Sequence, residues 1–151
     1  MNGIVVINKP VGLTSQQVVT KVKKALNQSK VGHLGTLDPL ASGVLPICIG
    51  KATKLFDFYL KKTKTYVAEF TFGQETDTLD SEGQVIKSTD YIPTKQEILN
   101  NLHKLIGDLE QIPPKYSAKS VGGIRAYELS RKGIDFELKS KQISVYKFEL
   151  L

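Results

Sequence analysis

Residues 32–49 have the sequence GHLGTLDPLASGVLPICI, a glycine-rich loop that runs into an apolar segment. The part from Gly32 to Gly43 contains three glycines and an Asp-Pro pair, which is typical of a structured loop. The part from Val44 to Ile49 is apolar and has the length of a strand, so we expect a buried strand there. The stretch therefore predicts a loop that ends on a strand of the core.

The segments on either side alternate between strand and helix patterns. Gly3 to Asn8 is a short apolar run bounded by Lys-Pro, which indicates a buried strand. Thr14 or Ser15 can cap a following helix, whose apolar residues recur at helical spacing at Val18, Val19, Val22 and Leu26. Further helices are expected over 52–60, 94–106 and 126–132, and further strands over 65–72 and 143–150. This irregular mixture predicts an α+β fold.

Two of these predictions depend on local patterns. Thr94 with Glu97 forms the sequence of a capping box, followed by Ile98, Leu102, Leu105 and Ile106 on the expected inner face of a helix. Thr65 to Phe72 alternates apolar and polar residues around Tyr66, Phe70 and Phe72, which predicts a strand with one buried face.

Composition excludes several classes of protein. A length of 151 residues suits one domain. The single cysteine, Cys48, excludes a disulfide scaffold and a cysteine-based zinc cluster. No apolar run approaches the roughly 18 residues of a membrane span, and the first ten residues lack the pattern of a signal peptide. We therefore expect a reducing, cytoplasmic setting with no membrane association.

The positive charge is concentrated in the first part of the chain. Residues 1–64 contain ten lysines and two acids, a net charge of +8, whereas residues 65–151 contain eleven basic residues and thirteen acids, a net charge of −2. This asymmetry suggests a polyanionic partner, most often nucleic acid. A solvated lysine surface that serves solubility explains it equally well.

Asp38 is the residue of the glycine-rich loop that could carry chemistry. It is one of two acids in the basic segment, and a carboxylate can act as a nucleophile. Taken alone, Asp38 is more simply explained as a turn residue that bonds its own backbone, and His33 as a structural loop histidine.

Four motifs, which occur in order along nearly the whole chain, favour a functional role for Asp38 and His33 over a purely structural one. Residues 32–46 closely resemble the catalytic motif of the TruB-type tRNA pseudouridine synthases. Residues 7–15 resemble the family's N-terminal Lys-Pro motif, residues 64–66 the strand with its tyrosine, and residues 113–127 its Pro-Pro and Ser-Ala-Lys segment. The resemblance implies a mixed, mostly antiparallel sheet with flanking helices, and conversion of uridine 55 in the tRNA T-loop to pseudouridine.

The resemblance also implies roles for individual residues. Asp38 matches the nucleophilic aspartate, which attacks either the ribose C1′ or the base C6, and the sequence leaves both routes open. His33 matches the residue that fills the space left by the flipped base, and Tyr66 the tyrosine that stacks on it. The residues expected to shape the loop are Lys9, Pro10, Gly35, Leu37 and Pro39. No cofactor or metal is implied, since no redox step occurs, and the implied partner is the tRNA T-arm with no protein partner.

Phosphate contacts are expected from lysines of the basic segment as a group: Lys21, Lys23, Lys24, Lys51, Lys54, Lys61, Lys62 and Lys64. Family members continue through a second half of the catalytic domain, which carries an arginine that pairs with the aspartate, and often through a C-terminal RNA-binding module. Arg125 and Arg131 lie in the wrong context to supply that arginine. We therefore expect residues 1–151 to be the N-terminal portion of a truncated catalytic domain.

Two alternatives remain. The chain could be a fragment that binds RNA without catalysis, although its intact Asp38 argues against selection for binding alone. An unrelated phosphate-binding enzyme is the other alternative. It is disfavoured because Gly43 is followed by Val44 rather than by the Lys-Ser/Thr of a P-loop.

Overall fold

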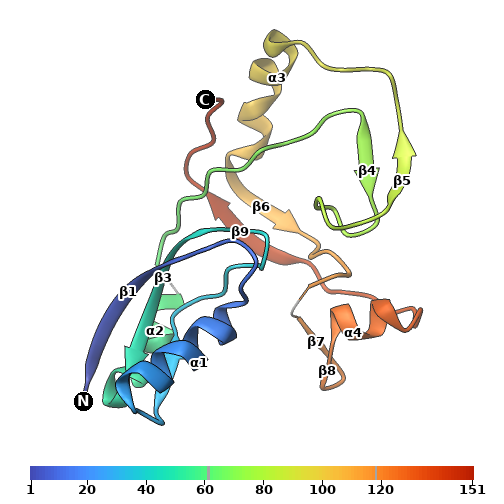
Figure 1. Cartoon of the computed structure of the whole chain (residues 1–151). Helices are drawn as coiled ribbons and strands as arrows, with labels where there is room; N and C mark the ends of the chain where they lie inside the picture. The colour runs from blue at the N-terminus through green and yellow to red at the C-terminus, as the bar shows by residue number, and fades with distance from the viewer. Residues whose placement is uncertain (61, 118) are drawn as a thin grey trace. The chain divides into compact units, whose positions relative to one another are not determined.

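The computed structural model describes residues 1–60, 62–117 and 119–151, which form two compact units, Met1–Val67 and Ala68–Leu151. Figure 1 shows helices and short antiparallel strands in the described residues, which confirms the α+β prediction. Two residues of the predictions lie outside the described residues: Lys61, one of the lysines expected to contact phosphate, and Ala118 of the Ser-Ala-Lys segment.

The first unit is built on a three-stranded antiparallel sheet. Its strands are β1 (Gly3–Lys9), β3 (Gly43–Ile49) and β2 (Val31–His33), in the order β1-β3-β2. The predicted strands over 3–8 and 44–49 are confirmed. The predicted loop is shorter than expected, because its first residues pair with β3 as part of β2 and leave residues 34–42 as the loop proper.

Helix α1 (Ser15–Leu26) follows β1 and begins where the sequence predicts. Thr14 is the N-cap: its side chain accepts a hydrogen bond from the backbone N–H of Gln17, and the Gln17 side chain accepts one from the N–H of Thr14. This reciprocal pair is a capping box. The helix ends at Asn27, whose φ of 49° lies in the left-handed region that terminates helices.

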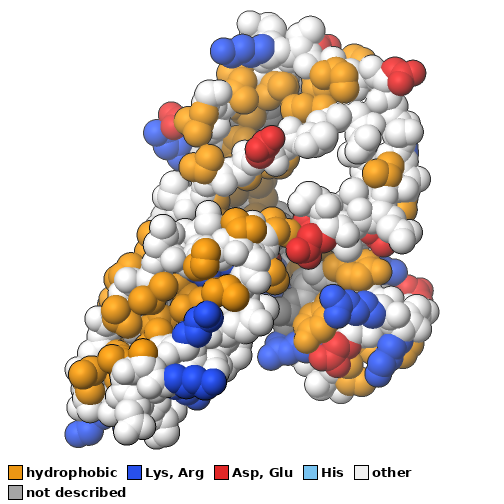
Figure 2. Space-filling model, viewed as in Figure 1, with side chains coloured by type: hydrophobic (Ala, Val, Ile, Leu, Met, Phe, Trp, Pro, Cys, Tyr) orange, Lys and Arg blue, Asp and Glu red, His pale blue; other side chains and the backbone are white. Residues whose placement is uncertain are grey.

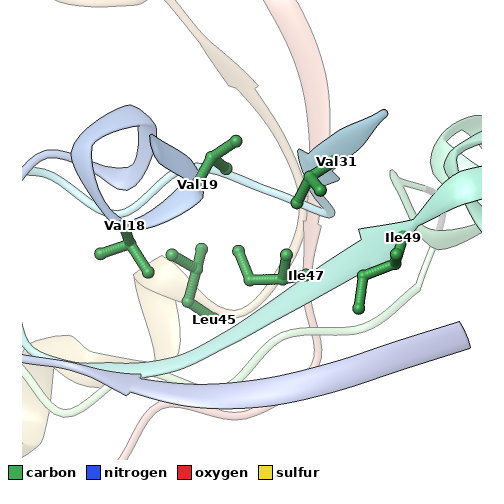
Figure 3. Close-up of a cluster of buried hydrophobic side chains, with 6 residues drawn as sticks. All are labelled: Val18, Val19, Val31, Leu45, Ile47 and Ile49. Carbon is green, nitrogen blue, oxygen red and sulfur yellow. The ribbon is translucent and has the colours of Figure 1, made fainter. Parts of the chain in front are cut away.

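The core of this unit joins α1 to one face of the sheet. Val18 and Val19 of α1 lie in one buried cluster with Leu45 and Ile47 of β3 (Figure 3), and Val31 and Ile49 supply the remaining buried positions. Each fully buried side chain of this kind contributes about 1.5–3 kcal/mol. The packed helix therefore provides a rigid support for the loops at its ends.

The opposite face of the same sheet is apolar but exposed. Ile4, Val6 and Val44 are 41%, 61% and 71% exposed. Exposed faces of antiparallel sheets usually carry polar residues. An apolar face is typical of a surface that packs against another structural element.

The strand predicted over residues 65–72 is wrong. These described residues have no regular secondary structure, and Tyr66, Phe70 and Phe72 are 69%, 65% and 45% exposed. Alternating side chains favour a pleated backbone, but a strand exists only where a neighbouring strand takes up its backbone hydrogen bonds. No described strand pairs with this segment.

A 3₁₀ helix, η1 (Gly50–Leu55), and α2 (Phe56–Leu60) follow β3, as expected for a short helix over 52–60. The described residues of the second unit form three two-stranded antiparallel sheets and two α-helices. The sheets pair β4 (Gln74–Thr76) with β5 (Val85–Ser88), β6 (Gly107–Gln111) with β9 (Lys141–Val145), and β7 (Ser120–Val121) with β8 (Ile124–Arg125). The helices are α3 (Lys95–Leu102), extended by the 3₁₀ helix η2 (His103–Leu105), and α4 (Ala126–Arg131).

Two boundaries in this unit differ from the predictions. The Thr94–Glu97 capping box is confirmed, but α3 ends at Leu102, so Leu105 and Ile106 lie beyond it and are 46% and 42% exposed. The last predicted strand, 143–150, is observed as Lys141–Val145, because its partner β6 provides only five paired positions. Among the described residues, no helix is both long and apolar enough to cross a membrane.

Candidate active site

The glycine-rich loop lies at one end of the three-stranded sheet. β1 and β2 end there, β3 begins there, and the turn after β1 leads into the first residue of α1. Lys9 at the end of β1 pairs with Gly43 at the start of β3, and His33 at the end of β2 pairs with Ile47. This arrangement brings the Lys-Pro motif beside the Asp38 loop, which Lys9 and Pro10 are expected to shape.

The residues on both sides of Asp38 are tied to the segment that leads into α1. The Ser15 hydroxyl accepts a hydrogen bond from the Leu37 backbone N–H at 2.9 Å and donates one to the Leu37 carbonyl at 3.0 Å. The Gly12 N–H donates to the carbonyl of Pro39 at 2.8 Å. The chain is thus fixed immediately before and immediately after Asp38.

Asp38 itself is exposed, and its carboxylate has no hydrogen bond or ion pair with any other described residue. Its backbone carbonyl accepts a hydrogen bond from the N–H of Ala41 at 3.0 Å, which closes a turn at this point of the loop. A carboxylate in this state is open to an incoming ligand, while its backbone is held in place. That combination suits a nucleophile.

Lys9 is fully buried, which is unusual for a lysine. It continues the inward alternation of Val5 and Ile7 along β1, so its side chain enters the helix-facing side of the sheet. Its Nζ donates to the carbonyls of Pro10 at 2.9 Å and Leu13 at 2.7 Å. These bonds compensate for burial of the ammonium group and close the turn that presents Gly12 to the Asp38 loop.

His33 lies on the same side of the sheet as the core. It is half-buried, and its Nδ1 is buried with no hydrogen-bond partner among the described residues. Leu34 follows it and donates its backbone N–H to the Pro46 carbonyl at 2.9 Å, which continues the β2–β3 pairing by one residue. Gly35 then takes a φ of 121°, in the left-handed region that only glycine adopts without strain. The chain can therefore turn into the loop directly after His33.

Tyr66 is the one predicted site residue outside this constellation. It is 69% exposed, in a segment without regular structure, so the buried strand face predicted around Tyr66 is wrong. Within the described chain it makes no hydrogen bond or ring contact with residues 34–42.

The lysines predicted to contact phosphate lie on the surface of the first unit. Lys21, Lys24, Lys51, Lys54, Lys62 and Lys64 are exposed and Lys23 is half-buried. Lysine side chains are visible over this unit at the lower left of Figure 2. The Nζ atom of Lys62 also lies 4.2 Å from the centre of the Phe58 ring, which is a cation–π distance. Among the described residues, no group of three His, Cys, Asp or Glu side chains could hold a metal ion.

The chain was compared with models of known protein families, with curated proteins and with solved structures. Residues 23–151 match the TruB family pseudouridylate synthase (N terminal domain). The chain belongs to this family. The resemblance stated from the sequence is therefore confirmed.

Two relatives of this TruB-family chain show how much of a longer protein it covers. The tRNA pseudouridine synthase B of Clostridium kluyveri is 48% identical over 151 residues, which are 100% of this chain and 52% of that protein. The protein of the same name from Saccharophagus degradans is 46% identical over 152 residues, covering 100% of this chain and 49% of its own. The chain spans about half the length of the curated relatives it matches.

The fold is also found in a solved structure. A chain from the crystal structure of a Cbf5-Nop10-Gar1 complex superposes with a TM-score of 0.59 at 23% identity, over 99% of this chain and 36% of that one. This match supports the mixed α+β fold expected from the sequence.

The bonds between Ser15 and Leu37 were not predicted from the sequence. Both residues lie in the matched motifs, but the sequence pattern indicates Ser15 only as a possible helix cap. Because Thr14 takes the cap, the Ser15 hydroxyl is available for a contact 22 residues away. The sequence signal for this contact was the presence of two adjacent hydroxyl residues where a cap needs one.

Proposed function

We propose that the protein containing these residues converts uridine 55 in the T-loop of tRNA to pseudouridine, with Asp38 as the nucleophile. The observation that carries this proposal is the loop at the end of the sheet, in which Asp38 is exposed and the residues on both sides of it are tied down. Membership of the TruB family and the names of the relatives support the same reaction and a tRNA substrate.

The chemistry is an isomerisation, so it needs no oxidant, reductant or cofactor. The bond between C1′ of the ribose and N1 of the uracil breaks, the base turns, and a new bond joins C1′ to C5. The proton on C5 is lost and N1 gains one, so the atoms balance. Asp38 assists by attacking either C1′ or C6, and both routes leave the enzyme unchanged after one turnover.

His33 and Tyr66 are proposed to handle the target base. The uridine must leave the T-loop stack, which costs a few kcal/mol. His33 ends β2 beside the loop, and it is proposed to fill the space that the base vacates. Tyr66 is proposed to stack on the flipped uracil, which is worth about 1–3 kcal/mol. Its 69% exposure leaves the ring free for that contact.

The remaining motif residues are proposed to hold the loop rather than touch the base. Lys9 closes the turn from Pro10 to Leu13, and Gly35 provides the bend after His33. Leu37 and Pro39 make the backbone hydrogen bonds, to Ser15 and Gly12, on either side of Asp38. Phosphates of the tRNA T-arm are proposed to bind the exposed lysines of the first unit, since the lysine-rich surface suits a polyanion.

The test uses the full-length protein encoded by the gene and an unmodified transcript of a tRNA with uridine 55. After incubation the RNA is digested and pseudouridine is quantified by chromatography. We expect about one pseudouridine per tRNA and none in a matched transcript with cytidine 55. RNA binding without pseudouridine would favour the non-catalytic RNA-binding alternative, and pseudouridine in the cytidine 55 transcript would show that the site is another uridine.

A further inference from the structure

We infer that Ser15 is a positioning residue for Asp38. Its hydroxyl fixes the orientation of the peptide group that joins Leu37 to Asp38. This inference rests on the proposed function, because it assigns Ser15 a part in the reaction of Asp38. Ser15 does not touch the substrate in this account. It acts through Leu37.

Leu37 takes both hydrogen bonds that the Ser15 hydroxyl makes among the described residues. A serine offers one donor and an acceptor oxygen, and here the donor goes to the Leu37 carbonyl and the oxygen accepts the Leu37 N–H. The Leu37 carbonyl belongs to the planar peptide group that joins Leu37 to Asp38. The hydrogen bond to the Leu37 carbonyl therefore fixes the plane of the peptide group that precedes Asp38.

The support for this contact is rigid. Ser15 is 2% exposed and is the first residue of α1, whose Val18 and Val19 are buried in the core against β3. The Leu37 side chain packs against the same core cluster. The two hydrogen bonds thus connect the Asp38 loop to the buried core of the first unit, and the Gly12–Pro39 bond holds the other side of Asp38.

Loss of the hydroxyl should loosen the loop without unfolding the unit. Leu37 is half-buried, so water can replace the lost hydrogen bonds, and alanine is a good residue for the first turn of a helix. Asp38 would then sample wrong orientations while the RNA-binding surface stays intact. Because misplacement of a reacting group by 1 Å can cost about 100-fold in rate, we expect Ser15→Ala to lower kcat by about 10- to 100-fold. KM should change by less than about threefold, since the phosphate contacts that govern binding are elsewhere.

Thr14→Ala provides the matched control in the full-length protein. It removes a hydroxyl from the neighbouring residue and weakens α1 by deleting its N-cap, but it leaves the Ser15–Leu37 bonds in place. We expect Thr14→Ala to lower the melting temperature and to keep kcat near wild type well below that temperature. A fall in kcat of equal size in both variants would overturn the inference, since it would show that Ser15 acts only through the stability of the helix. Ser15→Cys, with a weaker donor and acceptor of similar size, should fall between wild type and Ser15→Ala.

Amide hydrogen exchange separates this inference from the proposed function. In Ser15→Ala, exchange of the Leu37 N–H should become at least about tenfold faster, while that of Ile47 in the core should be unchanged. An unchanged Leu37 exchange rate would overturn the inference, whatever the reaction. Faster exchange with an unchanged kcat would also overturn it, since the loop would then not need Ser15. A wild-type protein that makes no pseudouridine, with Leu37 exchange still dependent on Ser15, would refute the proposed function while leaving the Ser15 contact in place.

Discussion

The backbone N–H of Gly12 donates a 2.8 Å hydrogen bond to the carbonyl of Pro39, so the turn after β1 supports the residue that follows Asp38. Gly12 has a φ of 86°, and a Cβ placed there would meet nothing within 4 Å. The space is therefore open, but the backbone conformation is one that L side chains avoid.

Gly12→Ala should consequently disturb the turn through backbone strain alone. We expect a loss of about 1–2 kcal/mol in the free energy of unfolding, and a lower kcat as the Pro39 tie weakens. Gly3→Ala is the control, because a Cβ at Gly3 also meets nothing but its φ is not positive. Equal effects of the two variants, measured by chemical denaturation and turnover, would contradict this role for Gly12.

Lys9→Met should affect activity more than stability. Two hydrogen bonds from a charged donor are worth about 1.5–3 kcal/mol each, and desolvation of the ammonium costs several kcal/mol, so the two effects nearly cancel. We expect the free energy of unfolding to change by less than about 2 kcal/mol, while kcat falls because the carbonyls of Pro10 and Leu13 are released. The exposed Lys30→Met serves as the control. Normal turnover in Lys9→Met would show that the turn holds its shape without the buried ammonium.

Binding to RNA should depend on salt through the lysines of the first unit. Lys21 and Lys24 are exposed and lie one turn apart on α1. Changing both to Gln should make the slope of log K against log salt shallower by about one per lysine, as measured with a T-arm RNA. The double variant Lys139→Gln and Lys141→Gln is the control, because it removes the same number of positive charges from the second unit. If both pairs of substitutions left the slope unchanged, the solvated-surface interpretation of the lysines would be favoured.

The Thr94–Glu97 capping box gives a pH-dependent prediction. The Thr94 side chain and backbone, and then the Tyr91 hydroxyl, donate hydrogen bonds that lower the pKa of Glu97 from 4.5 to about 2. A carboxyl with a lowered pKa in the folded state stabilises the fold above its ordinary pKa. This contribution to α3 is therefore lost as the pH falls from 4.5 to about 2.

Thr94→Val should raise the pKa of Glu97 toward 4.5, because it removes the largest of these contributions. Thr94→Ser keeps the hydroxyl and should leave the pKa low. Carboxyl chemical shifts followed by NMR through an acid titration distinguish the two. A Glu97 pKa that is the same in both variants would show that Thr94 does not set it.

Local patterns in the sequence predicted local structure well. The Thr94–Glu97 capping box, the apolar spacing of Val18 and Val19, and the apolar run of β3 all depend on residues within one turn or one strand, and all are confirmed. The prediction over residues 65–72 was wrong because a strand also needs a partner, which alternation cannot supply.

The sequence predicts which motifs form the site, but it does not predict the contacts between them. The sequence placed Asp38 in a structured loop and Lys9 in a supporting motif. It did not indicate that Lys9 is fully buried or that Ser15 holds Leu37, because these contacts arise when the end of β1 and the start of α1 meet the loop before β3. The inward alternation of Val5, Ile7 and Lys9 was the available sign that the lysine is buried.

The central claim, that Asp38 is the nucleophile, is tested most directly by Asp38→Asn in the full-length protein. The substitution keeps the shape of the side chain and removes the carboxylate. Asp57→Asn is the matched control, since Asp57 is the other acid of residues 1–64 and is exposed at the start of α2. With uridine 55 tRNA under single-turnover conditions, we predict no detectable pseudouridine from Asp38→Asn, RNA affinity within about threefold of wild type, and normal turnover by Asp57→Asn. Pseudouridine formation by Asp38→Asn within tenfold of the wild-type rate would contradict the account.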